Sequence, residues 1–200
     1  MGEVCGSKAG KENRGTERNP GHVLQEHPLL VNDRLPYRTI ERRRQELKHM
    51  IFVGIDPGKK GAIAYIDEDK VLTMPYTDER MCNVCRELNE RFYSAGDETR
   101  CCVEKVGAMP GQGTVSMFSF GKSAGFIEGV LHAFRIPYQL VPPQTWKKEF
   151  SLSKQGKEKS VEVCKRLFPG VSLLPTARCT KENDGMAEAL LMAEYAKRKM

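Results

Sequence analysis

The chain has 200 residues, of which 40% are hydrophobic and 29% charged, and its net charge is +6. This is an ordinary composition for one globular domain with a sizeable core. No apolar run approaches the ~18 residues of a membrane span, and the first residues lack the apolar core of a signal peptide. We therefore expect neither a membrane protein nor an exported one, while the basic balance allows a nucleic-acid partner.

Residues 1–49 differ in composition from the rest of the chain. They are rich in Gly, Asn, Arg, Lys and Glu and show no sustained apolar period, which predicts a largely disordered extension before a domain at 50–200. A short helix is conceivable only over 39–49. Because a transit peptide would be poorer in acidic residues, we expect a cytoplasmic location, with an organelle such as the chloroplast as the alternative.

The seven cysteines are odd in number and accompany no export signal, which favours reduced thiols. Cys82 and Cys85 form a single CxxC inside a helical pattern. A zinc site would need two further ligands at suitable spacing, so packing of these thiols in the core is the favoured interpretation.

From Met50 onward the pattern predicts alternating strands and helices. Short apolar runs bounded by turn residues predict strands over 51–55, 62–66, 71–74, 99–106 and 138–141. Apolar residues at helical spacing predict helices from Thr77 or Asp78 to Gly96, over 115–135 and over 183–199. The order βββαβαβα predicts an α/β fold, with one mixed sheet and helices on its faces.

Three glycines, Gly121, Gly125 and Gly129, recur every four residues in the second predicted helix. Glycine in a helix interior costs about 1 kcal/mol relative to alanine. The stripe therefore suggests a close approach by a neighbouring element, a dimer partner or a DNA backbone, and the sequence does not choose among them.

Four acidic residues stand at unusual positions. Asp56 ends an apolar strand, Glu104 lies within one, and Asp184 and Glu188 share one face of the last helix, a face that continues with apolar residues. Carboxylates in such places need neutralising, and several that converge could bind hard divalent cations such as Mg²⁺. Each acid alone also has an ordinary explanation as a turn, ion-pair or helix-cap residue.

A basic stretch follows the fifth predicted strand. Trp146 and Phe150 alternate there with seven basic residues: Lys147, Lys148, Lys154, Lys157, Lys159, Lys165 and Arg166. Basic and aromatic side chains together suit phosphate contact and base stacking. An amphipathic helix that buries Val161, Cys164 and Leu167 and leaves its lysines in solvent explains the same pattern, and one helix could do both.

Five segments, in order, resemble motifs of the RuvC-type Holliday junction resolvases, chiefly the phage and chloroplast branch. They are Gly54-Ile55-Asp56-Pro57-Gly58 with Gly61-Ala62, Val103-Glu104-Lys105-Val106, Gly111-Gln112-Gly113 through Gly125, Val141 to Lys148, and Asp184 to Leu190. Together the five segments fall between about Met50 and Lys197.

The resemblance implies an RNase H-like fold with a five-stranded mixed sheet flanked by helices. It implies that Asp56, Glu104, Asp184 and Glu188 bind two Mg²⁺ ions, with Mn²⁺ as a substitute, and that Lys159 assists catalysis. DNA contact is expected from Lys122, Trp146, Lys147, Lys148, Lys154, Lys157 and Lys159. The expected protein is a homodimer that nicks two strands of a four-way DNA junction symmetrically, which suits two-fold symmetry.

One departure bears on selectivity. Where bacterial members carry a phenylalanine used to open the junction, this chain has Gly107, with Met109 or Phe118 as possible replacements. Strict junction selectivity is therefore in doubt.

Three alternatives remain open. One is an RNase H-fold nuclease that acts on other branched DNA or on RNA–DNA hybrids. A second is an actin-like ATPase, which shares the superfold but needs two lobes. A third is a junction-binding protein without catalysis, which the presence of all four acids disfavours.

Overall fold

The computed structural model describes residues 49–58, 60–107, 111 and 113–200. The predicted N-terminal extension, apart from His49, lies outside the described residues, as does Met109. No helix among the described residues is long and apolar enough to cross a membrane.

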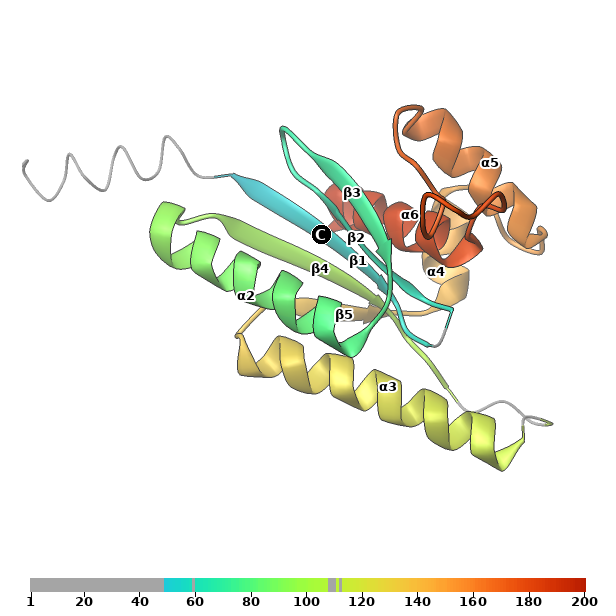
Figure 1. Ribbon diagram of the computed structural model, residues 1–200, viewed down its shortest axis with the longest axis horizontal. Coiled ribbons are helices and arrows are strands. Elements are labelled where there is room, and N and C mark those ends of the chain that lie inside the picture. Colours follow the sequence, from blue (N-terminus) through green and yellow to red (C-terminus); the bar gives the residue numbers. More distant parts are fainter. Residues whose placement is uncertain (1–48, 59, 108–110, 112) are drawn as a thin grey trace, which may run out of the picture. The chain divides into compact units, whose positions relative to one another are not determined.

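Five strands form one mixed sheet in the order β3-β2-β1-β4-β5 (Figure 1). They are β1 Met50–Asp56, β2 Ala62–Ile66, β3 Val71–Pro75, β4 Glu98–Glu104 and β5 Tyr138–Val141. β2 pairs antiparallel with both β1 and β3, whereas β4 pairs parallel with β1 and with β5. β2 alone therefore runs against the other strands, and the predicted α/β fold with one five-stranded mixed sheet flanked by helices is confirmed.

Five described helices cover the two faces of the sheet (Figure 1). α2 Asp78–Ala95 and α3 Thr114–Ala133 pack on one face, and α4 Pro143–Glu149, α5 Lys157–Leu167 and α6 Asp184–Lys199 on the other. Thr77 caps α2 by accepting a hydrogen bond from the Arg80 amide, and Gly96 ends it in a left-handed conformation. Cys85 packs from α2 into the core, as the helical pattern predicted, whereas Cys82 is only partly buried.

The basic stretch is not one helix. The chain breaks between α4 and α5, where Ser151 and Lys154 adopt positive φ values of 57° and 61°. A right-handed helix cannot pass through such residues, so the two basic helices point in different directions, and each presents its own side chains to α6.

Side chains of β1 alternate between two cores. Ile51, Val53 and Ile55 point toward α2 and α3, while Phe52 lies on the α6 face, as expected for a strand buried on both sides. Gly54 also faces α6, and a Cβ built there would lie 2.0 Å from the Ala189 carbonyl oxygen. Only glycine lets the two backbones come this close.

We predict that Gly54→Ala destabilises the fold by about 3 kcal/mol, or prevents folding, because the obstructing atoms belong to the α6 backbone and cannot turn aside. Gly129→Ala is the matched control: an added Cβ there meets nothing within 4 Å, and helix propensity favours alanine by about 1 kcal/mol. Chemical denaturation of both variants measures the difference. Equal stability of the two would contradict the packing.

The glycine stripe of α3 has a different environment. Gly121, Gly125 and Gly129 are exposed, and no described atom lies within 4 Å of a Cβ built at any of them. Among the described residues, no strand or helix approaches the stripe, which removes the first of the three explanations considered above.

Candidate active site

Two of the four acids meet because β1 and β4 run parallel and in register. Gly54 pairs with Cys102 and Ile55 with Val103, so Asp56 and Glu104 end adjacent strands at the same edge of the sheet. Gly54 and Cys102, two residues before these acids, face α6. Because side chains alternate along a strand, a residue two positions further on points to the same side. Both carboxylates therefore point to the α6 side.

The other two acids come from the first turns of α6, which begins at this same edge. Asn183 caps the helix by accepting a hydrogen bond from the Met186 amide at 2.9 Å. Next to it, a Cβ built on Gly185 would lie 3.1 Å from Asp56 Oδ2 and 2.3 Å from the Lys60 carbonyl oxygen. Asp56 is thus packed against the α6 N-terminus, between Asp184 and Glu188 along the helix.

Glu188 is buried, with 7% of its surface exposed, and receives two partners from other helices. Lys147 of α4 forms an ion pair with its Oε1 at 3.0 Å, and the Ser160 hydroxyl of α5 donates to the same oxygen at 3.2 Å. Ser160 is itself buried. Sequence reasoning missed it; its signal was its place on the apolar face of α5, three residues before Val163 and four before Cys164.

Trp146 occupies a different place from the one predicted. Its side chain is fully buried, and its indole Nε1 donates a hydrogen bond to Glu104 Oε1 at 3.1 Å. The Lys147 ammonium lies 5.0 Å from the centre of the indole ring. A ring enclosed in this way cannot stack on a DNA base, so Trp146 orients Glu104 instead.

Of the two lysines at the start of α5, it is Lys157 and not Lys159 that reaches the acids. Lys157, at the start of α5, donates a hydrogen bond to Asp184 Oδ2. Lys159 instead pairs with Glu162 on the exposed side of α5, at 2.7 and 2.8 Å to its two carboxylate oxygens. The predicted catalytic role of Lys159 is thus not supported by its position, because two residues of helix turn its side chain away.

Burial and like charge dominate the electrostatics of the innermost acids. Burial, then the charges of Glu104 and Glu188, raise the pKa of Asp56 well above its ordinary value, while Lys157 and Lys147 oppose the shift. The pKa of Glu104 is also raised, by burial and by Glu188, against the hydrogen bond from Trp146. Neighbouring carboxylates therefore hinder the ionisation of both Asp56 and Glu104.

Asp184 behaves in the opposite way. Burial acts to raise its pKa, but the hydrogen bond and the charge of Lys157 outweigh burial and lower it. The pKa of Lys157 is raised by the same contact. Both members of this outer pair are ionised, and the Lys157 ammonium places a positive charge beside the four acids.

The four carboxylates fit the ligand set of a hard divalent cation, because all their donor atoms are oxygens and nearby positive charge would favour ionised Asp56 and Glu104. Among the described residues, no three His, Cys, Asp or Glu side chains already lie close enough to enclose a metal ion. The ammonium groups of Lys147 and Lys157 are positioned against Glu188 and Asp184 instead. Cation binding would therefore require these lysines to shift.

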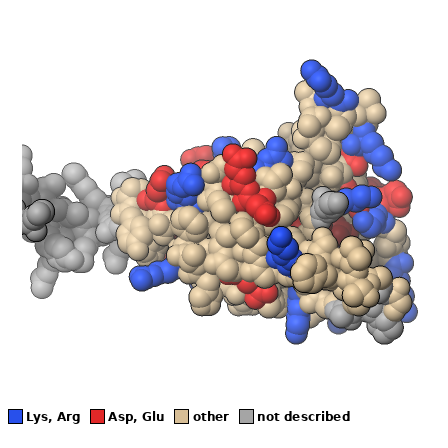
Figure 2. All heavy atoms as spheres, turned by 60° about the horizontal axis from the view of Figure 1, so that its bottom comes forward, with Lys and Arg blue, Asp and Glu red and all other residues tan. Residues whose placement is uncertain are grey.

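The remaining predicted DNA-binding lysines lie on the surface. Lys148 and Lys154 are exposed around the end of α4, and Lys122 is exposed on α3. In Figure 2, Lys and Arg side chains gather toward the right-hand end of the molecule, where α5 and the first turns of α3 lie in Figure 1. Of the two positions considered with Gly107, Phe118 lies on α3 with 76% of its surface exposed.

We predict that Trp146→Phe slows cleavage about tenfold, since loss of one hydrogen bond to a charged group costs about 1.5 kcal/mol or more. The fold should persist, because Phe retains most of the buried apolar area. Single-turnover rates at saturating DNA, together with thermal unfolding, separate the two effects. Phe150→Leu, in the same core but away from Glu104, is the control. A rate equal to that of the wild type would remove the orienting role.

No protein-family model matches the chain, and no curated protein matches it. Similar solved structures include RuvC of Thermus thermophilus, with 17% identity, a TM-score of 0.46, and coverage of 74% of this chain and 96% of that one. T. thermophilus RuvC in complex with a Holliday junction substrate has 15% identity and a TM-score of 0.45, and the match covers 75% of this chain and 97% of that one. The yeast mitochondrial Holliday junction resolvase Ydc2 has 15% identity and a TM-score of 0.38, and the match covers 82% of this chain and 91% of that one.

Proposed function

We propose that the chain is a magnesium-dependent endonuclease that resolves four-way DNA junctions. The observation that carries the nuclease proposal is the convergence of Asp56, Glu104 and Glu188 at one edge of the sheet, where burial and mutual repulsion raise the pKa of the first two. Buried carboxylates that repel one another destabilise the fold, so their presence in one place points to a functional site.

In this proposal, Asp56, Glu104, Asp184 and Glu188 hold two Mg²⁺ ions, for which Mn²⁺ can substitute. Two ions bound there would supply an activated water and would stabilise the leaving oxygen of a phosphodiester. The protein's own groups prepare the site: Trp146 orients Glu104, and Ser160 orients Glu188. Lys157 and Lys147 add positive charge where a phosphate has to approach four carboxylates.

The choice of a four-way junction rests on the resemblance of the five sequence motifs to those of the resolvases, and so does the homodimer. Basic side chains flank the acids from two directions, with Lys147 and Lys148 on α4 and Lys157 at the start of α5. Contacts from such lysines to DNA phosphates would provide affinity that does not depend on the base sequence.

A nuclease acting on other branched DNA or on RNA–DNA hybrids is the second candidate, and Gly107 favours it. This residue is exposed and has no side chain with which to open a junction. An actin-like ATPase needs two lobes, whereas the described residues form a single five-stranded sheet.

The test is a side-by-side cleavage assay on a four-way junction, a flap, a duplex and an RNA–DNA hybrid, with Mg²⁺, Mn²⁺ or chelator. We expect metal-dependent cutting of the junction, with nicks mapped to symmetric positions on two opposite strands. Preferential cutting of the flap or the hybrid would favour the second candidate. Absence of cutting on every substrate with either metal would contradict the nuclease proposal.

A further inference from the structure

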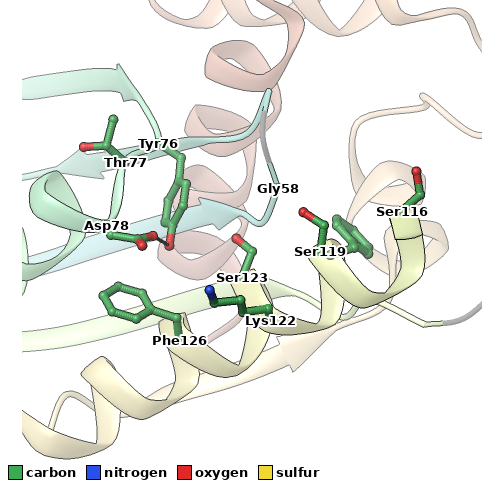
Figure 3. Close-up of a pocket in the computed structure, with 10 residues that line it drawn as sticks. Gly58, Tyr76, Thr77, Asp78, Ser116, Ser119, Lys122, Ser123 and Phe126 are labelled. Atoms are coloured by element: carbon green, nitrogen blue, oxygen red, sulfur yellow. Dashed lines mark hydrogen bonds between the residues drawn. The ribbon is translucent and has the colours of Figure 1, made fainter. Parts of the chain in front are cut away.

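A second feature lies beside the acids, on the α3 side of the sheet edge. It is a cleft of about 610 Å³ between the turn after β1, the connection from β3 to α2, and the first half of α3 (Figure 3). Gly58, two residues after Asp56, forms part of its wall. The turn that follows Asp56 therefore borders both the acids and the cleft.

The α3 wall of the cleft is a row of hydroxyl groups. Ser116, Ser119 and Ser123 recur at intervals of three and four residues, so they lie on one side of the helix, and Figure 3 shows them along the cleft. Further along the same side of α3, Ile127 and Leu131 enter the core. Where this side leaves the core and borders the cleft, it carries hydroxyl groups in place of apolar side chains.

The Ser123 hydroxyl is buried beside Tyr76, and its Oγ has no hydrogen-bond partner of ordinary geometry among the described residues. The Tyr76 hydroxyl donates to Asp78 Oδ1 at 2.7 Å (Figure 3). Burial, followed by that hydrogen bond, raises the pKa of Tyr76, while the Ser123 hydroxyl acts to lower it, so the phenol stays protonated. Ser123 is thus only weakly engaged by Tyr76, and its oxygen keeps acceptor capacity for a ligand in the cleft.

The cleft also offers one cation and flat apolar surface. Lys122, exposed on α3, lies at its edge, and Phe120 and Phe126 contribute aromatic rings. The Phe120 ring lies 3.0 Å from a Cβ built on Gly58, so this ring closes the cleft on the side of the acids. Asp78 is the one acidic group among the lining residues, and the Tyr76 hydroxyl caps it.

We propose that this cleft binds one unpaired nucleotide of the DNA strand that passes the acids, an inference that rests on the proposed function. Hydroxyls and Lys122 suit the phosphate and sugar, and aromatic rings suit a base of any identity. The volume lies within the range of small-ligand pockets, about 300–1,000 Å³. A duplex is too wide for such a cleft, so the cleft selects DNA in which a nucleotide near the cut is unpaired.

The experiment uses the full chain carrying Asp56→Asn, which allows DNA binding without cutting. A single-stranded oligonucleotide containing 5-iododeoxyuridine is bound and irradiated, and the cross-linked peptide is identified by mass spectrometry. We expect cross-links to Tyr76, Phe120 or Phe126. Affinity for the same oligonucleotide should fall about tenfold with Ser119→Leu, which fills the cleft, because stacking of one base contributes about that much.

Lys122→Gln should weaken binding of the strand and reduce the slope of log affinity against log salt by about one. Lys70→Gln is the matched control, since Lys70 lies in the turn between β2 and β3, at the other end of the sheet. Cross-links outside the cleft, or unchanged affinity in both cleft variants, would overturn the proposal. Cross-links in the cleft of a protein that cuts no DNA would support the cleft and contradict the nuclease, so the two failures remain distinct.

Discussion

Asp56→Asn is expected to reduce metal-dependent cleavage by on the order of 10³-fold or more, while junction affinity stays within about twofold of wild type. The reason is position: Asp56 is flanked by Glu104 from β4 and by the first turns of α6, so it is central to any cation shared among the acids. Asparagine keeps the shape and one oxygen but removes the charge. Single-turnover cleavage and a binding titration in chelator measure the two quantities.

The same substitution separates catalysis from folding. Because the pKa of Asp56 is raised in the folded protein, its ionisation opposes folding. Without metal, the free energy of unfolding of the wild type should fall as pH rises from the ordinary value of 3.8 toward the raised one. The Asp56→Asn variant should lack this pH-dependent loss of stability, and near pH 7 it should be at least as stable as the wild type. The control is Asp69→Asn, which removes an exposed acid in the β2–β3 turn and should leave this pH dependence unchanged. A wild-type cleavage rate in Asp56→Asn would exclude Asp56 from the active site.

The fold was largely predictable because its elements obey local rules. The strands over 62–66 and 138–141 match the predicted bounds, since turn residues on both sides fix where each one ends. Caps at Thr77, Gly96 and Asn183 likewise mark the helix ends they predict. The predicted order of elements lacked α4 and α5 as separate helices, and Ser151 and Lys154, which separate them, carry no strong preference for the left-handed conformation they adopt.

The grouping of the acids followed from chain geometry, whereas their partners did not. Parallel strands in register bring Asp56 and Glu104 to one edge, and a four-residue interval puts Asp184 and Glu188 on one helix face. Which basic or polar side chain reaches them depends on how α4 and α5 rotate on α6. A sequence pattern does not contain that rotation, so the roles of Trp146, Lys159 and Ser160 had to come from the structure.

Lys157→Met is expected to slow cleavage by about 10²-fold at saturating metal, the cost of removing one donor that acts on charge in an active site. Lys157 reaches Asp184, and its charge acts on Asp56 and Glu104 as well. Lys159→Met is the matched control: it lies on the same helix, two residues on, and its ammonium is engaged by exposed Glu162. Its rate should stay within about twofold of wild type, since an exposed pair of this kind contributes little.

The comparison of these two lysine variants also distinguishes two roles for Lys157. If its ammonium acts on the phosphate, the Met variant stays slow however much Mg²⁺ is added. If the ammonium only neutralises Asp184 until a cation arrives, the Met variant should need less Mg²⁺ for half-maximal rate and should reach the wild-type maximum. The second result would contradict a catalytic role for Lys157. A slow Lys159→Met with a normal Lys157→Met would instead mean that α5 turns on α6 when DNA binds.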